Sequence, residues 1–303
     1  MSPRKKAAFI FLALLLGAAA VALPLEILAR VKGYKPWKLY DPGRIKIQPP
    51  GSFYQVDPEL GFKHRPGRFR LAMPDGYTFE VTHGADTLRQ THSGPVQTGK
   101  PALWIFGCSL THGWALNDNE TYPWVLQEKL PGFEIVNFGV GGYNTFQSLA
   151  QLKQALLSRE KPQAVILAYA SMHDERNASL RSWKRALVTY NGHNEMLSYP
   201  YGYFDEKGQL QVSRNRDVHF NIPPAKFSAA AFFLETLMEK QQEKKTRAAD
   251  VSKAAILWMD RVCRQEGVHF IVAGIDEDAK TRIMLEFCRA RGIKTASCAT
   301  TST

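Results

Sequence analysis

Three short stretches of the chain carry residue types that could carry out acyl transfer. Cys108 and Ser109 follow the apolar run "ALWIF", the glycine-rich segment "NFGVGGYN" (137–144) follows "FEIV", and "SMHDERN" (171–177) follows "AVILAYA". Serine offers a nucleophile, a glycine turn exposes backbone N–H groups to an oxyanion, and a polar side chain adds a further donor. A serine acyl-transfer site needs these groups within one small volume.

Each stretch also has a simpler interpretation. A serine before a helix is more often a cap than a nucleophile. The segment "GVGG" does not match GxGxxG, which argues against a dinucleotide site. His173 and Asp174 would ordinarily be a helix cap and a surface charge. The shared position of the three stretches at strand ends favours a site, because ligands gather at the carboxyl edge of a parallel sheet.

The elements that would position these residues follow an alternating pattern. Strand-like apolar runs alternate with helix-like stretches at 121–130, 145–158 and 248–266, which predicts a parallel α/β sheet. The apolar runs are "ALWIFG", "FEIVNFG", "QAVILAYA" and "VHFIVAGI". The pattern breaks at 178–247, where we predict an insertion containing a hairpin that turns at Lys207-Gly208 and an amphipathic helix.

The N-terminal segment, 1–30, is the clearest targeting signal. Arg4, Lys5 and Lys6 precede 17 uncharged residues, as in a secretory signal. A spanning helix needs about 20 residues, and "PLEILARV" can complete the span. We favour an uncleaved anchor over a cleaved signal or a buried helix. The basic residues would keep the N-terminus cytoplasmic, which predicts a single-pass protein of a bacterial inner membrane with a periplasmic main domain.

The region between the N-terminal segment and the sheet, the net charge and the cysteines limit which partners and sites can be expected. Residues 31–100 are expected to form a linker and a β-rich preface, with a turn at "MPDGY". The net charge of +11 favours anionic partners, but the basic residues are scattered and no nucleic-acid signature is present. The four cysteines lack CxxC spacing, so neither a metal site nor a cofactor is predicted. Cys263 and Cys288 could form a disulfide or remain two buried thiols.

The three stretches, in this order and spacing, resemble the motif blocks of the SGNH/GDSL hydrolases, over about 55–298. The resemblance implies a three-layer α/β/α sandwich with a mostly parallel, flavodoxin-like sheet, assigned to 101–303. It implies that Ser109 is the nucleophile and that the N–H groups of Ser109 and Gly142 form the oxyanion hole. His173 occupies the position of the family's usual asparagine and would add a donor, because an imidazole N–H can also donate.

Two departures from the family pattern concern the nucleophile and its base. Cys108 stands where aspartate is common, and a cysteine nucleophile is the alternative to Ser109, although a neighbour on the turn points away from the site. The family's C-terminal Asp-x-x-His pair is absent, so we expect the chain to be truncated or altered near 297. His112 and His173 are the candidate substitute bases.

Other late residues fit the missing pair poorly. Glu266 precedes His269 by three positions, but His269 opens a strand whose far end faces Ser109, roughly 16 Å away along the sheet. Asp276 and Asp278 lie at the correct edge but have no accompanying histidine.

These observations predict an exported serine esterase or deacylase that acts on an O-acyl ester, with an acylated small molecule or a glycan as substrate. Two alternatives stay open: O-acyl transfer to a cell-surface glycan, and non-catalytic glycan binding or assembly on a degenerate hydrolase scaffold. The membrane would be a partner through the N-terminal helix. The sequence does not indicate an oligomeric state.

Overall fold

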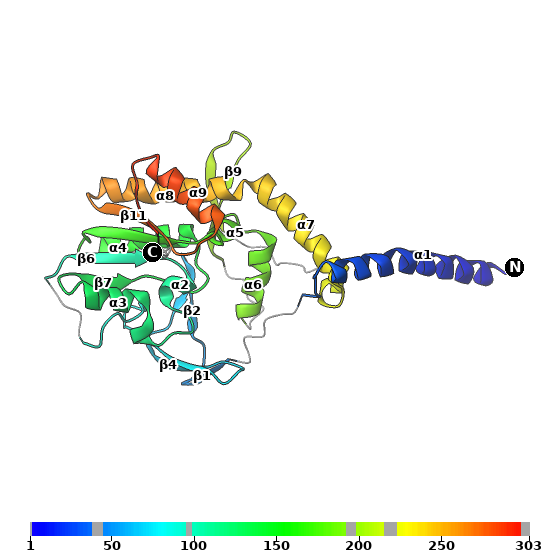
Figure 1. The fold of residues 1–303 in the computed structure, drawn as a ribbon, viewed down its shortest axis with the longest axis horizontal. Helices are drawn as coiled ribbons and strands as arrows, with labels where there is room; N and C mark the ends of the chain where they lie inside the picture. The colour runs from blue at the N-terminus through cyan, green and yellow to red at the C-terminus, as the bar shows by residue number, and fades with distance from the viewer. Residues whose placement is uncertain (1, 38–44, 95–98, 192–197, 215–222, 298–303) are drawn as a thin grey trace, which may run out of the picture.

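The computed structural model describes residues 2–37, 45–94, 99–191, 198–214 and 223–297. The expected alteration after 297 and Cys298 lie outside these residues. Figure 1 shows a rounded α/β body from which the N-terminal helix projects.

The body is built on a five-stranded parallel sheet, as the sequence predicted. Its order is β7-β6-β8-β11-β12, which in chain order is the 2-1-3-4-5 arrangement of flavodoxin-like folds. The strands are β6 (Ala102–Phe106), β7 (Glu134–Asn137), β8 (Ala164–Tyr169), β11 (His269–Gly274) and β12 (Lys294–Ser297). The apolar runs predicted the first four. β12 was missed because this edge strand is short, partly polar and largely exposed.

Helices flank both faces of the sheet. One buried core joins α4 (Thr145–Ser158), α8 (Ala248–Gln265) and α9 (Ala279–Arg289) to alternate residues of β6, β8 and β11, so these three helices share a face. The shorter α3 (Tyr122–Lys129) packs on β7. Right-handed crossovers place α3 on the opposite face, and Figure 1 shows it on the other side of β6 from α8 and α9. The sequence patterns predicted α3, α4 and α8 but not α9.

The strands expected before the sheet are present. β1 (Lys46–Gln48), β4 (Gly67–Ala72) and β5 (Thr78–His83) form an antiparallel sheet, and β2 (Tyr54–Asp57) pairs with β3 (Gly61–His64). The turn at "MPDGY" joins β4 to β5, with Gly76 at φ +91. Arg89 bridges to both His83 and Asn137, which connects this region to the edge of the main sheet. We refer to residues 45–94 as the preface.

The segment between β8 and α8 contains the predicted hairpin and helix. It comprises α5 (His173–Asn177), α6 (Arg181–Asn191), β9 (Pro200–Phe204), β10 (Leu210–Arg214), η3 (Pro223–Lys226) and α7 (Ala229–Thr246). The hairpin turns at Lys207-Gly208, where Gly208 has φ +73.

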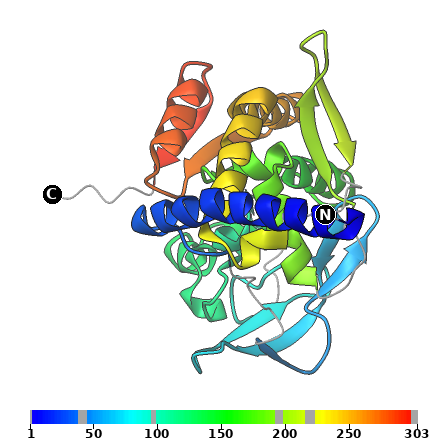
Figure 2. The same ribbon diagram turned by 90° about the vertical axis from the view of Figure 1, so that its right-hand side faces the viewer.

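The N-terminal helix α1 (Pro3–Val31) is long and apolar enough to cross a membrane. Its C-terminal part packs on α7, and Figure 2 shows the two helices crossing. Glu26 of α1 accepts hydrogen bonds from the hydroxyl of Ser228 and from the N–H groups of Ala229 and Ala230. α1 is therefore joined to the first turn of α7 by polar as well as apolar contacts.

Candidate active site

Ser109 stands at a tight turn from strand to helix. β6 ends at Phe106, and the short helix α2 (Ser109–His112) begins with Ser109 itself. A Cβ on Gly107 would lie 2.1 Å from the hydroxyl oxygen of Thr111, so only glycine allows the strand to turn this closely. The N-cap position belongs to Cys108, and no side chain caps this helix. The geometry therefore does not support the interpretation of Ser109 as a cap.

Ser109 opens onto a cavity of about 250 Å³. The cavity lies beside the carboxyl ends of β6 and β8, the point where strand order reverses and where ligands of such sheets bind. Its walls combine aromatic rings with a few polar groups. The lining residues are Tyr54, Phe62, Ser109, Trp114, Gly141, Gly142, Glu175, Arg176, Ser182, Trp183, Ala186 and Leu187.

The glycine segment after β7 forms the part of the cavity wall next to Ser109. Gly142 has φ +90, and a Cβ there would lie 3.1 Å from the Trp183 ring. A Cβ on Gly141 would lie 2.6 Å from the Tyr54 hydroxyl and 4.0 Å from the Ser109 Cβ. The absence of side chains therefore leaves this backbone close to Ser109 and open to the cavity.

Asn137 fixes the glycine segment to α2. Its side-chain N–H donates to the Thr111 carbonyl at 3.0 Å, and its oxygen accepts from the Gly139 N–H at 2.9 Å. Asn144 then begins α4 through reciprocal bonds with Gln147. Asn137 was not predicted as a site residue, although its position at the end of a strand was a usable signal.

His173 turns away from the cavity surface. Its side chain is 1% exposed, and it does not line the cavity. Burial opposes ionisation of the neighbouring Cys108 thiol, but His173, with a contribution from Arg176, outweighs burial and lowers the pKa of Cys108 to about 6. Neither ring nitrogen of His173 has a hydrogen-bond partner in the described part of the chain. The oxyanion role of His173 stays a prediction.

Cys108 is fully buried, while the adjacent Ser109 lines the cavity. The two side chains therefore lie on different sides of the turn, as expected. Asp174 is not a surface charge: it is buried and accepts a 2.5 Å hydrogen bond from the Tyr169 hydroxyl. Burial raises the pKa of Asp174 above its ordinary value.

Two cavity residues were not foreseen as site residues from the sequence. Arg176 stacks on Trp183 at 4.6 Å and donates to the Tyr143 carbonyl at 3.4 Å. Glu175 accepts a hydrogen bond from the Ser182 hydroxyl. Both belong to α5, which follows the third motif block, so the cavity has a cation and a carboxylate on the wall next to Trp183.

None of the histidines in the described ranges lines the cavity. His112 is buried and its Nε2 lies 2.9 Å from that of His83. His269 stands at the amino end of β11, as expected, which is the edge remote from Ser109. Asp276 accepts bonds from the N–H and hydroxyl of Ser171 at 2.9 and 3.2 Å, and Asp278 caps α9. The identity of a base for Ser109 stays open.

The other two described cysteines are unpaired. Cys263 and Cys288 are buried free thiols in the core beneath α8 and α9. Burial raises the pKa of Cys263 to about 12 and that of Cys288 to about 11. The structure therefore contains two buried thiols in place of a disulfide.

No protein-family model and no curated protein sequence matches the chain. The solved structures that it resembles include AlinE4, an SGNH-hydrolase family esterase, at 15% identity over 66% of this chain and 76% of that one, with a TM-score of 0.35. A putative acylhydrolase from Bacteroides fragilis is 12% identical over 67% of this chain and 70% of that one, with a TM-score of 0.34. A GDSL-like lipase from Bacteroides thetaiotaomicron is 12% identical over 68% of this chain and 72% of that one, with a TM-score of 0.32.

AlinE4 and the GDSL-like lipase carry the names of the SGNH/GDSL group, whose motif blocks the chain resembles. Identities and TM-scores this low do not by themselves support a shared activity. The chemistry of the chain therefore has to be judged from its own side chains.

Proposed function

We propose that the chain is an SGNH-type serine hydrolase that cleaves an O-acyl ester through an acyl-Ser109 intermediate. The observation that supports it best is that Ser109, after β6, and the Gly141-Gly142 turn, after β7, face one cavity at the reversal of strand order. Sequence motifs far apart in the chain meet there with the residue types that acyl transfer requires.

In the proposed reaction, the Ser109 oxygen attacks the ester carbonyl, and the proton that it loses is passed to the alkoxide that leaves. The N–H groups of Ser109 and Gly142 stabilise the oxyanion, because preplaced donors cost no reorganisation as the charge develops. The alcohol leaves with a proton, and water then attacks the acyl-serine to release the acid. Replacement of that water by a sugar hydroxyl would make the same site an O-acyltransferase.

The cavity favours a compact ester that bears a ring. Aromatic rings of Phe62, Trp114 and Trp183 line it, and they suit an apolar acyl group or the face of a sugar. Glu175 and Arg176 can bind hydroxyl groups on the alcohol part. We therefore propose an acylated glycan, or a small molecule of similar chemistry, as the substrate.

We further propose that α1 anchors the protein in a bacterial inner membrane, with the catalytic body periplasmic. The helix has 29 residues, and its apolar side chains are largely exposed. Arg4, Lys5 and Lys6 precede the apolar run, which favours a cytoplasmic N-terminus.

A second candidate is a non-catalytic glycan-binding protein on the same scaffold. It is favoured by one feature: within the described residues, the cavity has a serine and an oxyanion-type turn but no histidine on its walls. Binding would then use the aromatic rings with Glu175 and Arg176, and Ser109 would be unreactive.

Labelling with a fluorophosphonate separates the two candidates, because this probe reacts covalently with activated serines. Wild type should be labelled, and Ser109→Ala should not be. Ser182→Ala is the matched control, since Ser182 lines the same cavity but binds Glu175. A folded wild type that resists the probe, or undiminished labelling of Ser109→Ala, would exclude the serine-hydrolase mechanism.

Product analysis then distinguishes hydrolysis from transfer. A chromogenic acetate ester is supplied with and without a glycan acceptor. Release of acetate at a rate independent of the acceptor supports an esterase. Appearance of acetylated glycan, at the expense of acetate, supports the transferase.

A further inference from the structure

Three buried histidines meet beside residues 107–109, the turn that carries Ser109, which we call the catalytic turn after the proposed reaction. His64 ends β3, His83 ends β5 and His112 ends α2, and each is 2% exposed or less. Their candidate ligand nitrogens all lie within 4.8 Å of one another. We propose that these three imidazoles form a binding site for one divalent transition-metal ion, with Zn²⁺ as the best-suited ion.

The first support is the lack of hydrogen-bond partners in this cluster. Neither nitrogen of His64 has a partner among the described residues, and the Nδ1 of His112 has none either. Buried polar side-chain atoms nearly always have a partner, and an unrecorded ion is one of the standard explanations for an exception. A metal ion would accept the lone pair of one His64 nitrogen, which has no partner in the described part of the chain.

The second support is the tautomer of His83. Its Nδ1 lies 3.0 Å from the Arg65 carbonyl, which can only accept, so this nitrogen carries the proton. The Nε2 of His83 therefore presents its lone pair to the cluster, as in metal sites where the second ring nitrogen is bonded to a carbonyl. The arrangement could not be predicted from the sequence, because the three residues follow no zinc-ligand spacing.

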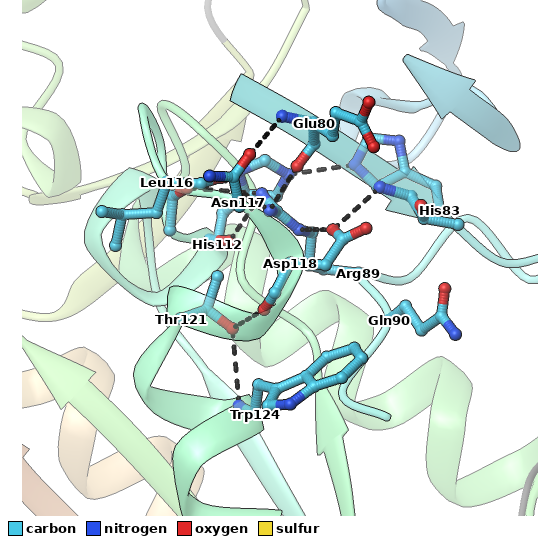
Figure 3. A network of polar contacts seen from close by, with 12 residues as sticks. Glu80, His83, Arg89, Gln90, His112, Leu116, Asn117, Asp118, Thr121 and Trp124 are labelled. Carbon is cyan, nitrogen blue, oxygen red and sulfur yellow. Dashed lines mark hydrogen bonds and ion pairs between the residues drawn. The ribbon is translucent and has the colours of Figure 1, made fainter. Parts of the chain in front are cut away.

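The distance between His83 and His112 fits an ion-free site. Their two Nε2 atoms lie 2.9 Å apart, which requires a proton on one of them. Figure 3 shows the two side chains together. Tetrahedral zinc with Zn–N bonds of 2.0–2.1 Å separates its ligand nitrogens by about 3.3 Å. Replacement of the shared proton by zinc thus needs only a small separation of the His83 and His112 rings. The His64 ring, which stacks on His83 with centroids 4.2 Å apart and an interplanar angle of 13°, must also rotate to direct a lone pair at the ion.

The surroundings keep the ligands neutral and enclosed. All three imidazoles are 2% exposed or less, and burial disfavours the charged form of an imidazole. The Phe53 ring lies 5.0–6.0 Å from all three imidazoles, and Tyr54 stacks on His64 at 5.0 Å. Neutral imidazoles bind zinc, cobalt, nickel or copper, whereas Mg²⁺ and Ca²⁺ prefer oxygen ligands.

One nearby charge opposes the ion. Arg89 lies beside the cluster, but its guanidinium is paired with Asp118 at 2.8 Å and donates to backbone carbonyls (Figure 3). We therefore expect a lower affinity than in a site with a carboxylate ligand.

The ion would join two parts of the fold. His64 and His83 belong to the preface, and His112 belongs to the helix that begins with Ser109. None of the three histidines lines the cavity. The proposed role is therefore to fix the preface against the catalytic turn, without contact with substrate.

The test uses the full chain, carrying an affinity tag without histidine and expressed in medium supplemented with Zn²⁺ or Co²⁺, so that the ion is present during folding. The variant is His64→Phe, which preserves the ring packing and removes a ligand. The control is His269→Gln, an exposed histidine outside the cluster. Metal content by mass spectrometry, the visible absorption of Co²⁺, and Tm with and without metal are measured.

We expect about one zinc ion per chain in wild type and in His269→Gln. His64→Phe should lose at least 100-fold in affinity for zinc, because even the loss of a group that only hydrogen-bonds to a ligand costs 10–100-fold. Zinc at about 100 times its Kd should raise the wild-type Tm by about 5–10 °C. Without metal, His64→Phe should be as stable as wild type or more so, because a partnerless buried polar group is removed.

Two outcomes would overturn the proposal. The first is a wild type that contains no zinc or cobalt and has a metal-independent Tm, and it decides the question even if the variant does not fold. The second is a His64→Phe protein that retains the metal or the metal-induced rise in Tm.

Discussion

Arg89 is the residue whose replacement should most disturb the preface and the catalytic turn together. Its side chain is 0% exposed and makes a 2.8 Å ion pair with Asp118. It also donates to four carbonyls at 2.9–3.3 Å, those of Glu80, His112, Gly113 and Leu116. Figure 3 shows this network, in which one guanidinium holds β5, α2 and the loop that leads to η2 (Asp118–Glu120).

Replacement of Arg89 by methionine keeps most of the side-chain length but removes every donor. Asp118 would lose its counter-charge, and the four carbonyls would lose a buried donor. Removal of one partner of a buried ion pair typically costs 3–5 kcal/mol. Asp118 keeps some solvent contact, with 18% of its side chain exposed, and it also accepts from the Thr82 N–H, so we expect about 3 kcal/mol.

The matched control is Arg68→Met in the same preface. Arg68 pairs with Glu80 at 2.5 Å, but the two side chains are 73% and 44% exposed. Exposed ion pairs contribute little, because solvent and salt screen them. This substitution should leave the unfolding midpoint unchanged within error.

The assay is urea unfolding of the full chain in detergent, followed by tryptophan fluorescence. A loss of about 3 kcal/mol is a large part of the 5–15 kcal/mol that stabilises a typical domain. Fluorophosphonate labelling of Ser109 should fall as well, because the carbonyls of His112 and Gly113 lose their fixed donor. Equal midpoints for Arg89→Met and Arg68→Met would refute the reasoning that burial makes this pair important.

Two further predictions concern the cavity. Gly142→Ala should lower the free energy of unfolding by about 1 kcal/mol more than Gly208→Ala and should reduce Ser109 labelling. Both glycines have positive φ, but only a Cβ at 142 meets an aromatic ring. Equal urea midpoints for the two variants would argue against this. The thiol of Cys108, with its pKa lowered to about 6 from about 9, should give a thiolate absorbance that rises near pH 6 and is missing in Cys108→Ser. Because the folded-state pKa is lowered, the stability linked to this ionisation is present above about pH 9 and is lost as the pH falls through 6. A Cys108 thiol that titrates only near pH 9 would contradict the contact with His173.

Much of the fold could be predicted from local sequence. Strands buried on both faces of a parallel sheet are continuous apolar runs, which is why β6, β7, β8 and β11 were recognisable. The helix pattern at 145–158 coincides with α4, whose N-cap Asn144 forms a reciprocal capping pair with Gln147 in its first turn. β12 lacks such a signal, because an edge strand needs less apolar surface.

The site was only partly predictable. Parallel strands bring their carboxyl ends to one edge, so Ser109 and Gly142 were expected to lie together, and they line one cavity. The packing of α5 decides which side chains of the third motif block, 171–177, face the cavity. His173 turns inward to Cys108, while Glu175 and Arg176 reach the cavity.

The sequence alone determined the parallel sheet, the apolar N-terminal helix and the placement of a serine and a glycine turn at neighbouring strand ends. Those features depend on local hydrophobic periodicity and short turns. The structure alone decided that His64, His83 and His112 meet, although they lie 19 and 29 positions apart in the chain. No local pattern encodes that meeting, because it arises only when the preface folds back against α2.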